Sequence, residues 1–145
     1  GRLLLAVLLT VIVGLGFLYY FQYRLPTTAE MENHFSSHRS AFERKNSELL
    51  SAMSKNMAID LGSDEETGCR FIEINPGPPL IIRYYTHQRG IGVGVFGAGV
   101  AYLELSQEKI YPSIEAMHDD ARKVEGFIGY GRISGSWYYF LWEAD

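Results

Sequence analysis

Residues 69–105 read CRFIEINPGPPLIIRYYTHQRGIGVGVFGAGVAYLEL, and this stretch decides the fold because it turns the chain into short β-like runs. Arg70 to Ile74 alternates in polarity, and Leu80 to Thr86 is rich in β-branched and aromatic residues, as strands are. Between them, Asn75-Pro76-Gly77-Pro78-Pro79 fits neither a strand interior nor a helix. Two strands joined by a turn are therefore predicted.

The second half of the same stretch is rich in glycine. Gly90 to Val95 and Val100 to Leu105 are predicted as a pair of strands divided by Gly97-Ala98-Gly99. Glycines at alternate positions would leave one face of the first strand bare, so that a helix or a ring could lie close. The chain closes with Trp137-Tyr138-Tyr139-Phe140-Leu141-Trp142, whose aromatic residues are too close together for one face. We expect this last strand to be buried on both sides or to show one side to a partner.

Residues 27–58 have the periodicity of a helix. Thr27 and Glu30 have the Thr-x-x-Glu spacing of a capping box, in which each side chain satisfies an amide of the first turn. Residues suited to a buried stripe then recur every three or four positions, at Met31, Phe35, His38, Phe42, Leu49, Leu50, Met53 and Met57. We predict one amphipathic helix to about Ala58, with its apolar stripe packed on the sheet rather than forming a groove for a partner.

Ile114 to Val124 is the third candidate helix, a short one bounded by Pro112 and Gly126. Together these elements predict an α+β fold, in which one long amphipathic helix packs on an antiparallel sheet of about five strands.

The first two dozen residues are apolar. Leu3 to Phe21 contains no charge, and as a helix it would extend about 28 Å, close to the roughly 30 Å of bilayer hydrocarbon. A cleaved secretory signal is the alternative, but the aromatic residues at the end of the run suit a membrane boundary better than a signal peptidase site. We therefore expect a single uncleaved transmembrane anchor over residues 1–26.

Ala6, Thr10 and Gly14 fall at four-residue spacing and place small residues on one face of this anchor. Such a face admits a neighbouring helix, although chance in a Leu/Val/Ala/Gly-rich span explains it equally well. With no charge in its interior and no second span beside it, Leu3 to Phe21 cannot by itself be a channel or transporter.

Residues 27–145 are long enough for one soluble domain. Arg2 and Arg24 are the only charged residues before Thr27, so this domain carries 11 basic and 17 acidic residues, a net charge of −6. That balance argues against nucleic acid or anionic lipid headgroups as the main partner and favours a basic protein surface. Basic residues flank the anchor almost equally, but a short tail before a long domain is typical of a signal anchor, so we expect an extracytoplasmic domain.

Three patterns that suggest chemistry are weak. Gly92-Val93-Gly94-Val95-Phe96-Gly97 satisfies G-x-G-x-x-G, but glycine and β-branched residues follow where a dinucleotide site needs a helix. Glu30, His34 and His38 lie one turn apart, yet a zinc site needs further ligands from elsewhere, so we expect a solvated His34 and a partly packed His38. The serines form no nucleophile motif, and Cys69 has only Arg70 beside it to lower its pKa. We expect no enzyme activity, no cofactor and no metal.

Several segments resemble a diffuse family of small proteobacterial envelope proteins, anchored by lipid or by a single span. They are His34-Phe35, His38-Arg39, Phe42-Glu43, Arg89-Gly90-Ile91, Gly99-Val100-Ala101-Tyr102 and Tyr130-Gly131-Arg132-Ile133-Ser134-Gly135-Ser136-Trp137-Tyr138. The similarity covers most of residues 34–142. The chain differs in lacking a lipid-bearing cysteine and in having Ala98 where a polar or basic residue is common. Such proteins resemble immunity proteins, so the resemblance implies a binding role.

Two functional hypotheses follow. The first is a membrane-tethered immunity-type protein in the inner membrane of a bacterium, with a periplasmic domain that binds and neutralises a secreted toxin. The second is an accessory or scaffolding subunit of a larger envelope complex. The residues we expect to contact a protein partner are Tyr130, Arg132, Trp137, Tyr139 and Trp142. The residues we expect to contact the lipid bilayer are Leu3, Ala6, Thr10, Gly14 and Phe21.

Overall fold

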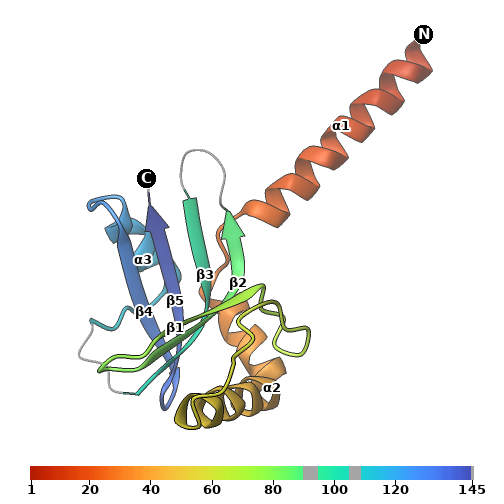
Figure 1. Ribbon diagram of the computed structural model, residues 1–145. Helices are drawn as coiled ribbons and strands as arrows, with labels where there is room; N and C mark the ends of the chain where they lie inside the picture. The colour runs from red at the N-terminus through yellow and green to blue at the C-terminus, as the bar shows by residue number, and fades with distance from the viewer. Residues whose placement is uncertain (90–94, 105–108, 145) are drawn as a thin grey trace.

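The computed structural model describes residues 1–89, 95–104 and 109–144, and their side chains except those of 21–23. Within these ranges the chain forms three helices and a five-stranded antiparallel sheet, with an apolar helix at the N-terminal end (Figure 1). The prediction of an α+β fold with an antiparallel sheet is confirmed.

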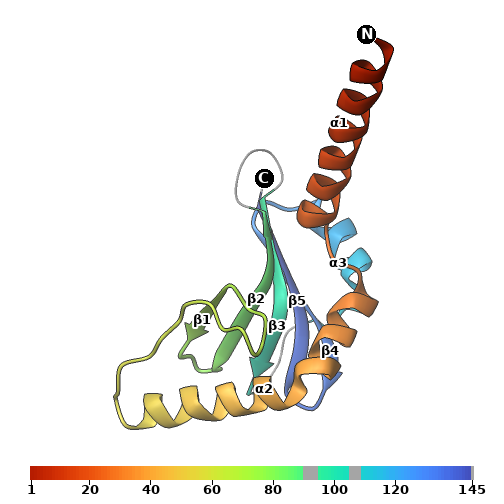
Figure 2. The ribbon, with the colours of Figure 1, turned by 90° about the vertical axis from the view of Figure 1, so that its right-hand side faces the viewer.

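Helix α1 (Arg2–Tyr23) extends away from the rest of the molecule (Figures 1 and 2). The segment Arg2–Tyr20 is exposed along its whole length, and it is long and apolar enough to cross a membrane. Pro26 ends the helix, because a proline disfavours helical backbone at the residue before it. The ion pair between Arg24 and Glu30, 2.6 Å from nitrogen to oxygen, joins this connection to the next helix.

Helix α2 (Thr28–Ser54) begins as predicted, since the Thr27 hydroxyl accepts the amide of Glu30 at 3.2 Å. The expectation of one continuous helix to Ala58 is wrong in two respects. The backbone of His38 is non-helical (φ −121°, ψ 17°), and its ring nitrogen Nδ1 donates to the carbonyl of His34 at 2.8 Å, a side-chain insertion of the kind that kinks helices. The helix then ends at Ser54, before Asn56, which has a positive φ of 54°.

The sheet has the strand order β1-β2-β3-β5-β4, and every neighbouring pair is antiparallel. Its strands are β1 (Phe71–Asn75), β2 (Ile81–Arg89), β3 (Val95–Leu103), β4 (Phe127–Ser134) and β5 (Trp137–Ala144). Strand β3 is at the centre of the sheet. The bounds of β1, β2 and β5 agree closely with the strands predicted from the sequence.

Two strand predictions need correction. Gly97-Ala98-Gly99 does not divide two strands, because β3 runs straight through it. The predicted strand at Gly90 to Val95 lies mostly outside the described residues. Strand β4 was not predicted, so the number of strands agrees but one of the five is a strand that the sequence did not indicate.

Helix α3 (Ile114–Ala121) is shorter than the predicted helix to Val124. The Ser113 hydroxyl caps it by accepting the amide of Ala116 at 3.0 Å. Thr28 joins the two helix starts, because its hydroxyl accepts the amide of Ile114 and donates to Glu115, both at 2.8 Å.

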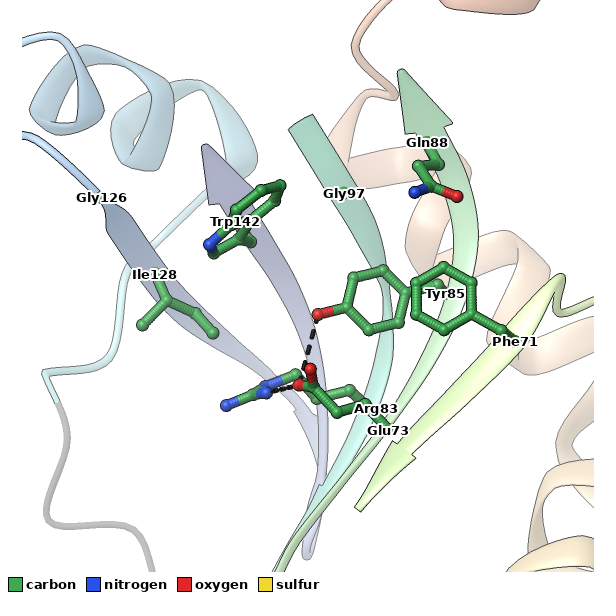
Figure 3. A pocket seen from close by; sticks show the side chains of 9 residues that line it. All are labelled: Phe71, Glu73, Arg83, Tyr85, Gln88, Gly97, Gly126, Ile128 and Trp142. Atoms are coloured by element: carbon green, nitrogen blue, oxygen red, sulfur yellow. Dashed lines mark hydrogen bonds and ion pairs between the residues drawn. The ribbon is translucent and has the colours of Figure 1, made fainter. Parts of the chain in front are cut away.

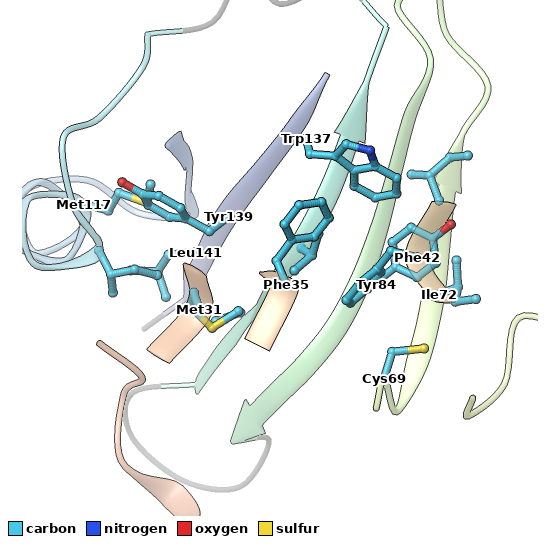
Figure 4. Close-up of a cluster of buried hydrophobic side chains, with 14 of the residues drawn as sticks. Met31, Phe35, Phe42, Cys69, Ile72, Tyr84, Met117, Trp137, Tyr139 and Leu141 are labelled. Atoms are coloured by element: carbon cyan, nitrogen blue, oxygen red, sulfur yellow. The ribbon is translucent and has the colours of Figure 1, made fainter. Parts of the chain in front are cut away.

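Both α2 and α3 lie on one face of the sheet, and the main core fills the space between these helices and the sheet (Figures 2 and 4). Phe42 lies near its centre, with no exposed surface and with its ring centroid 5.3 Å from Tyr84 and 5.9 Å from Trp137. The prediction that the apolar stripe of this helix packs on the sheet is therefore correct.

Candidate functional site: the open face of the sheet

The opposite face of the sheet, which we call the open face, carries no helix within the described residues. Its cluster of buried side chains comes from strands alone: Ile81, Tyr85, Ala101, Leu103, Tyr130, Tyr138 and Phe140, with Phe71 packed against them. The cluster on the other face includes residues of α2 and α3 as well. Among the residues that the structure describes, the sheet thus has one face covered by helices and one face with no helix over it.

Strand register places the open-face residues in rows across the sheet. One row, which we call the charged row, runs Glu73, Arg83, Ala101, Tyr138, Arg132 from β1 to β4. The next row contains Phe71, Tyr85, Gly99, Phe140 and Tyr130, and a third contains Gln88, Gly97, Trp142 and Ile128.

Tyr85, on β2, contacts two other aromatic residues of the second row. Its ring stacks on that of Phe71, with centroids 4.2 Å apart, and meets Phe140 edge-on at 4.9 Å. Gly97 allows the ring to lean over the neighbouring strand, since a Cβ at that position would lie 2.6 Å from Cε1 of Tyr85. Glycine in the middle of β3 is therefore a packing requirement of the open face.

Arg83 organises the polar part of the face. It forms an ion pair with Glu73 on β1 and donates from Nε to the hydroxyl of Tyr130 on β4 at 2.9 Å. The hydroxyl of Tyr85 also donates to Glu73, at 3.4 Å. Burial raises the pKa of Tyr85, and the nearby Arg83 opposes that shift. Arg83 is only 14% exposed, whereas Glu73 is 47% exposed and remains accessible.

Arg132, at the other end of the charged row, forms no ion pair with a described residue. Its guanidinium lies 5.6 Å from the ring centroid of Tyr138 and donates to the hydroxyl of that residue at 3.2 Å. Arg132 is exposed, so it presents a cation with donors that remain available to a carboxylate.

A hollow of about 490 Å³ lies in the open face (Figure 3). Tyr85 and Trp142 stand on either side of Gly97, with Arg83 and Glu73 toward one end and Gln88 toward the other. Phe71, Gly126 and Ile128 complete the lining. Its walls are aromatic and its polar groups few, which is the usual character of a recognition site.

The structure divides the five residues predicted to bind a partner. Tyr130, Arg132 and Trp142 lie on the open face, although Tyr130 is only 2% exposed. Trp137 and Tyr139 lie on the covered face, at 7% and 2% exposure, within the core beneath α2. Strand alternation explains the division: residues 138, 140 and 142 point to the open face, and 137 and 139 point to the helices. The burial of Trp137 and Tyr139 leaves them no surface for a partner.

Sequence reasoning missed the residues that β1 and β2 bring to the hollow: Phe71, Glu73, Arg83, Tyr85 and Gln88. A signal was present, because the turn at 75–79 fixes a hairpin and the alternation of its strands then places the first four on one face. The contribution of Gln88 depends on a register shift between Tyr85 and His87, which no local pattern predicts.

The histidines of α2 are engaged in structural contacts. His34 is half-buried and donates from Nε2 to the carbonyl of Thr67 at 2.7 Å, so the expectation of a solvated His34 is wrong. His38 is partly buried as expected, with its ring centroid 4.4 Å from that of His34. Among the described residues no group of three or more His, Cys, Asp or Glu side chains is arranged to hold a metal ion.

Two further groups could carry chemistry. Burial raises the pKa of Cys69, which keeps its thiol protonated and unreactive. His118 bonds Glu143 from Nδ1 at 2.7 Å, and Arg122 lies 3.1 Å from its Nε2, so both ring nitrogens have protein partners. Neither group adjoins the hollow of the open face.

The anchor residues lie on α1. Leu3, Ala6, Thr10 and Gly14 are exposed, and the side chain of Phe21 lies outside the described side chains. The Thr10 hydroxyl donates to the carbonyl of Ala6 at 2.9 Å, so its hydrogen is satisfied within the helix. The length and composition of α1 suit a membrane span, and a signal sequence has the same properties.

Comparison with known proteins gives no family, no curated relative and no solved structure that matches this chain.

Proposed function

We propose that this protein is a membrane-tethered binding protein that recognises another protein through the open face of its sheet. The observation that carries the proposal is a sheet face with an aromatic hollow and no helix over it within the described residues. Exposing Trp142 and Ile128 to water does not stabilise a monomer, and exposed apolar surface of this kind marks interaction sites.

The composition of the open face favours a protein partner. Protein interfaces are enriched in Tyr, Trp, Phe and Arg and depleted in Lys. The exposed or partly exposed members of this face include Phe71, Arg83, Arg132 and Trp142. None of the four lysines of the chain belongs to a strand. The net charge of −6 over residues 27–145 also disfavours nucleic acid.

We further propose the immunity type of binding, in which the domain neutralises a secreted toxin. The support is the sequence resemblance, together with a candidate site whose residues suit binding and include no nucleophile with its base. Three residues of the resembling segments, Tyr130, Arg132 and Tyr138, contribute to the open face.

An accessory subunit of an envelope complex is the second proposal. It would use the Ala6, Thr10 and Gly14 face of α1 to dock on other spans. In both proposals α1 crosses the inner membrane and the domain lies in the periplasm.

Photo-crosslinking in cells tests the binding proposal. Gln88 is exposed, lines the hollow and forms no hydrogen bond with a described residue, so a photoreactive amino acid there should leave the fold intact. The matched control is the same amino acid at Glu48, which is exposed on α2. We expect an adduct with one other protein from position 88, weakened by Trp142→Ala, and no such adduct from position 48.

The identity of that adduct decides between the two roles. If the partner stops growth when it is exported into the periplasm, and this chain restores growth, the immunity role is supported. A harmless envelope protein as partner favours the accessory role. If position 88 gives no adduct with another protein, or gives the same adducts as position 48, the open face is not the binding surface.

A further inference from the structure

We propose that the open face also pairs with the open face of a second copy of this chain, about a twofold axis parallel to the strands. Glu73 of each copy then lies opposite Arg132 of the other. The inference rests on the proposed function in one respect only, since both need the open face to be a protein-binding surface. A partner that uses this face would have to displace the second copy.

The charged row supplies the first argument. Glu73 and Arg132 occupy its two ends, on the edge strands β1 and β4, and β3 is at its centre. Rotation by 180° about an axis along β3 exchanges the two edges of a face-to-face pair. Each carboxylate then meets the guanidinium of the second copy, so the face is complementary to itself in charge.

Glu73 and Arg132 can each form this additional ion pair. Arg132 is exposed and forms no ion pair with a described residue. Glu73 accepts from Arg83 and Tyr85 through Oε1, and none of its described hydrogen bonds uses Oε2. The second copy therefore adds a cation to Glu73 without removing the one it already has, and gives Arg132 a carboxylate that no described residue of its own chain supplies.

A face-to-face axis at right angles to the strands is unfavourable. A twofold axis in the interface but perpendicular to the strands places β1 over β1 and β4 over β4. Glu73 would then face Glu73, and Arg132 would face Arg132, which is a repulsive arrangement of like charges. Of these two axes, the one along the strands brings opposite charges together.

The direction of α1 supplies an independent argument. This helix rises from the end of the sheet at which β2 and β5 end (Figure 1). A twofold axis along the strands leaves both copies of α1 on the same side of the dimer, where one bilayer can hold them. The perpendicular axis would send the two helices in opposite directions.

The size of the face predicts a weak dimer. Five strands about 4.8 Å apart and roughly 20 Å of strand length give a pair that buries on the order of 1,000 Å², near the lower limit for specific interfaces. Confinement of both anchors to one membrane raises their effective concentration, which offsets this small area.

Charge reversal in the full-length chain tests the pairing. The variants are Glu73→Arg and Arg132→Glu, and the measurement is the monomer–dimer equilibrium of each purified chain in detergent by sedimentation velocity. We expect each variant alone to dimerise about tenfold more weakly, because like charges then face each other twice. A mixture of the two should recover the wild-type dissociation constant, because every 73–132 contact becomes opposite in sign.

Arg39→Glu and Glu43→Arg are the matched controls, since these residues form an exposed ion pair on α2. They should leave dimerisation unchanged. A wild-type chain that stays monomeric, a dimer that both open-face variants leave intact, or a mixture no better than its components would each overturn the proposed dimer. The second result would place self-association on α1 instead.

A cysteine pair protects the test against misfolded variants. In Glu73→Cys/Arg132→Cys, oxidation should link two chains through residues 73 and 132, whereas Glu73→Cys alone should give no 73–73 link. Absence of the 73–132 link in a folded chain overturns the pairing. The proposed function stands apart from this result, because a monomeric chain can still give the adduct at position 88, and a dimer can form in a chain that binds no other protein.

Discussion

The imidazole of His34 donates from Nε2 to the backbone carbonyl of Thr67 across 2.7 Å, joining α2 to the loop that precedes β1. Gly68 makes the approach feasible, because its φ is +71° and a Cβ there would lie 2.9 Å from Cε1 of His34. The ring of His38 stacks on the other histidine at the kink of the helix. A half-buried imidazole thus connects the kink to the loop.

This arrangement predicts that acid destabilises the domain. Burial lowers the pKa of His34 and also that of His87, so the folded state favours their neutral forms. Below a pH of about 6.5 the unfolded chain binds more protons than the folded one, and the free energy of unfolding falls as pH falls. Each histidine contributes at most about 1.4 kcal/mol per pH unit, and less where solvent reaches the ring.

Denaturant unfolding in detergent between pH 7.5 and 5 measures this effect. His34→Gln removes one titrating ring and should flatten the pH dependence relative to wild type. Equal slopes for wild type and variant, or greater stability at pH 5, would contradict the prediction.

Tyr84 and Asn46 provide a test of the covered face. The Tyr84 hydroxyl donates to Oδ1 of Asn46 at 3.1 Å, and both residues are buried. Tyr84→Phe should lower the free energy of unfolding by about 1–3 kcal/mol, because it leaves a buried amide oxygen unpaired. Tyr85→Phe is the matched control: Glu73 keeps Arg83, so we expect a loss below about 1 kcal/mol. If the two variants lowered the free energy of unfolding equally, the buried hydrogen bond would contribute no more to stability than the one to Glu73, which would contradict the prediction.

Gly97→Ala tests whether glycine in β3 supports the open face. The new Cβ would need the Tyr85 ring to move, which should cost roughly 1–3 kcal/mol and weaken crosslinking from position 88. Gly131→Ala is the comparison on the covered face, where a Cβ would lie 2.1 Å from Cζ of Tyr139 in the core. Thermal unfolding should show a larger loss for Gly131→Ala, with no specific effect on crosslinking in whatever fraction folds.

Val11→Arg tests the anchor. An arginine at the centre of a span costs about 2.5–3.5 kcal/mol by insertion scales, so the variant should leave the carbonate-resistant membrane fraction, whereas Val11→Leu should stay in it. The intact mass of the wild-type protein decides between anchor and signal. A mature protein that lacks residues 1–26 would contradict the anchor, and a reporter at the C-terminus that works only in the cytoplasm would contradict the periplasmic placement.

Local sequence was sufficient for much of the fold. The Thr27 half of the capping box, the apolar stripe of α2 and the β-branched run of β2 depend on near neighbours, and each was predicted; Glu30, the other half of the box, pairs with Arg24 instead. Strand β4 was missed because Gly129 and Gly131 weaken its β pattern. Their small size serves distant rings: a Cβ at Gly129 would meet Phe127 and Met117, and one at Gly131 would meet Tyr139.

The candidate site was less predictable for a related reason. Trp142 and Arg132 were identified by their residue type, but Trp137 and Tyr139 have the same character and point the other way. Which face each residue takes depends on where α2 packs, and that is a property of the assembled domain. Glu73 and Arg83 reach the hollow only through the pairing of β1 with β2.

The short connection from Arg24 to Thr27 keeps the domain close to the end of α1, and this limits where the domain can contact a partner. Four residues span at most about 14 Å, and the ion pair from Arg24 to Glu30 shortens that reach. If α1 is held in a bilayer, the domain stays within a thin layer next to the membrane and diffuses in two dimensions. Any molecule it binds must then pass through that layer, so encounter rates should follow the density of this protein per unit area of membrane rather than its concentration in the cell.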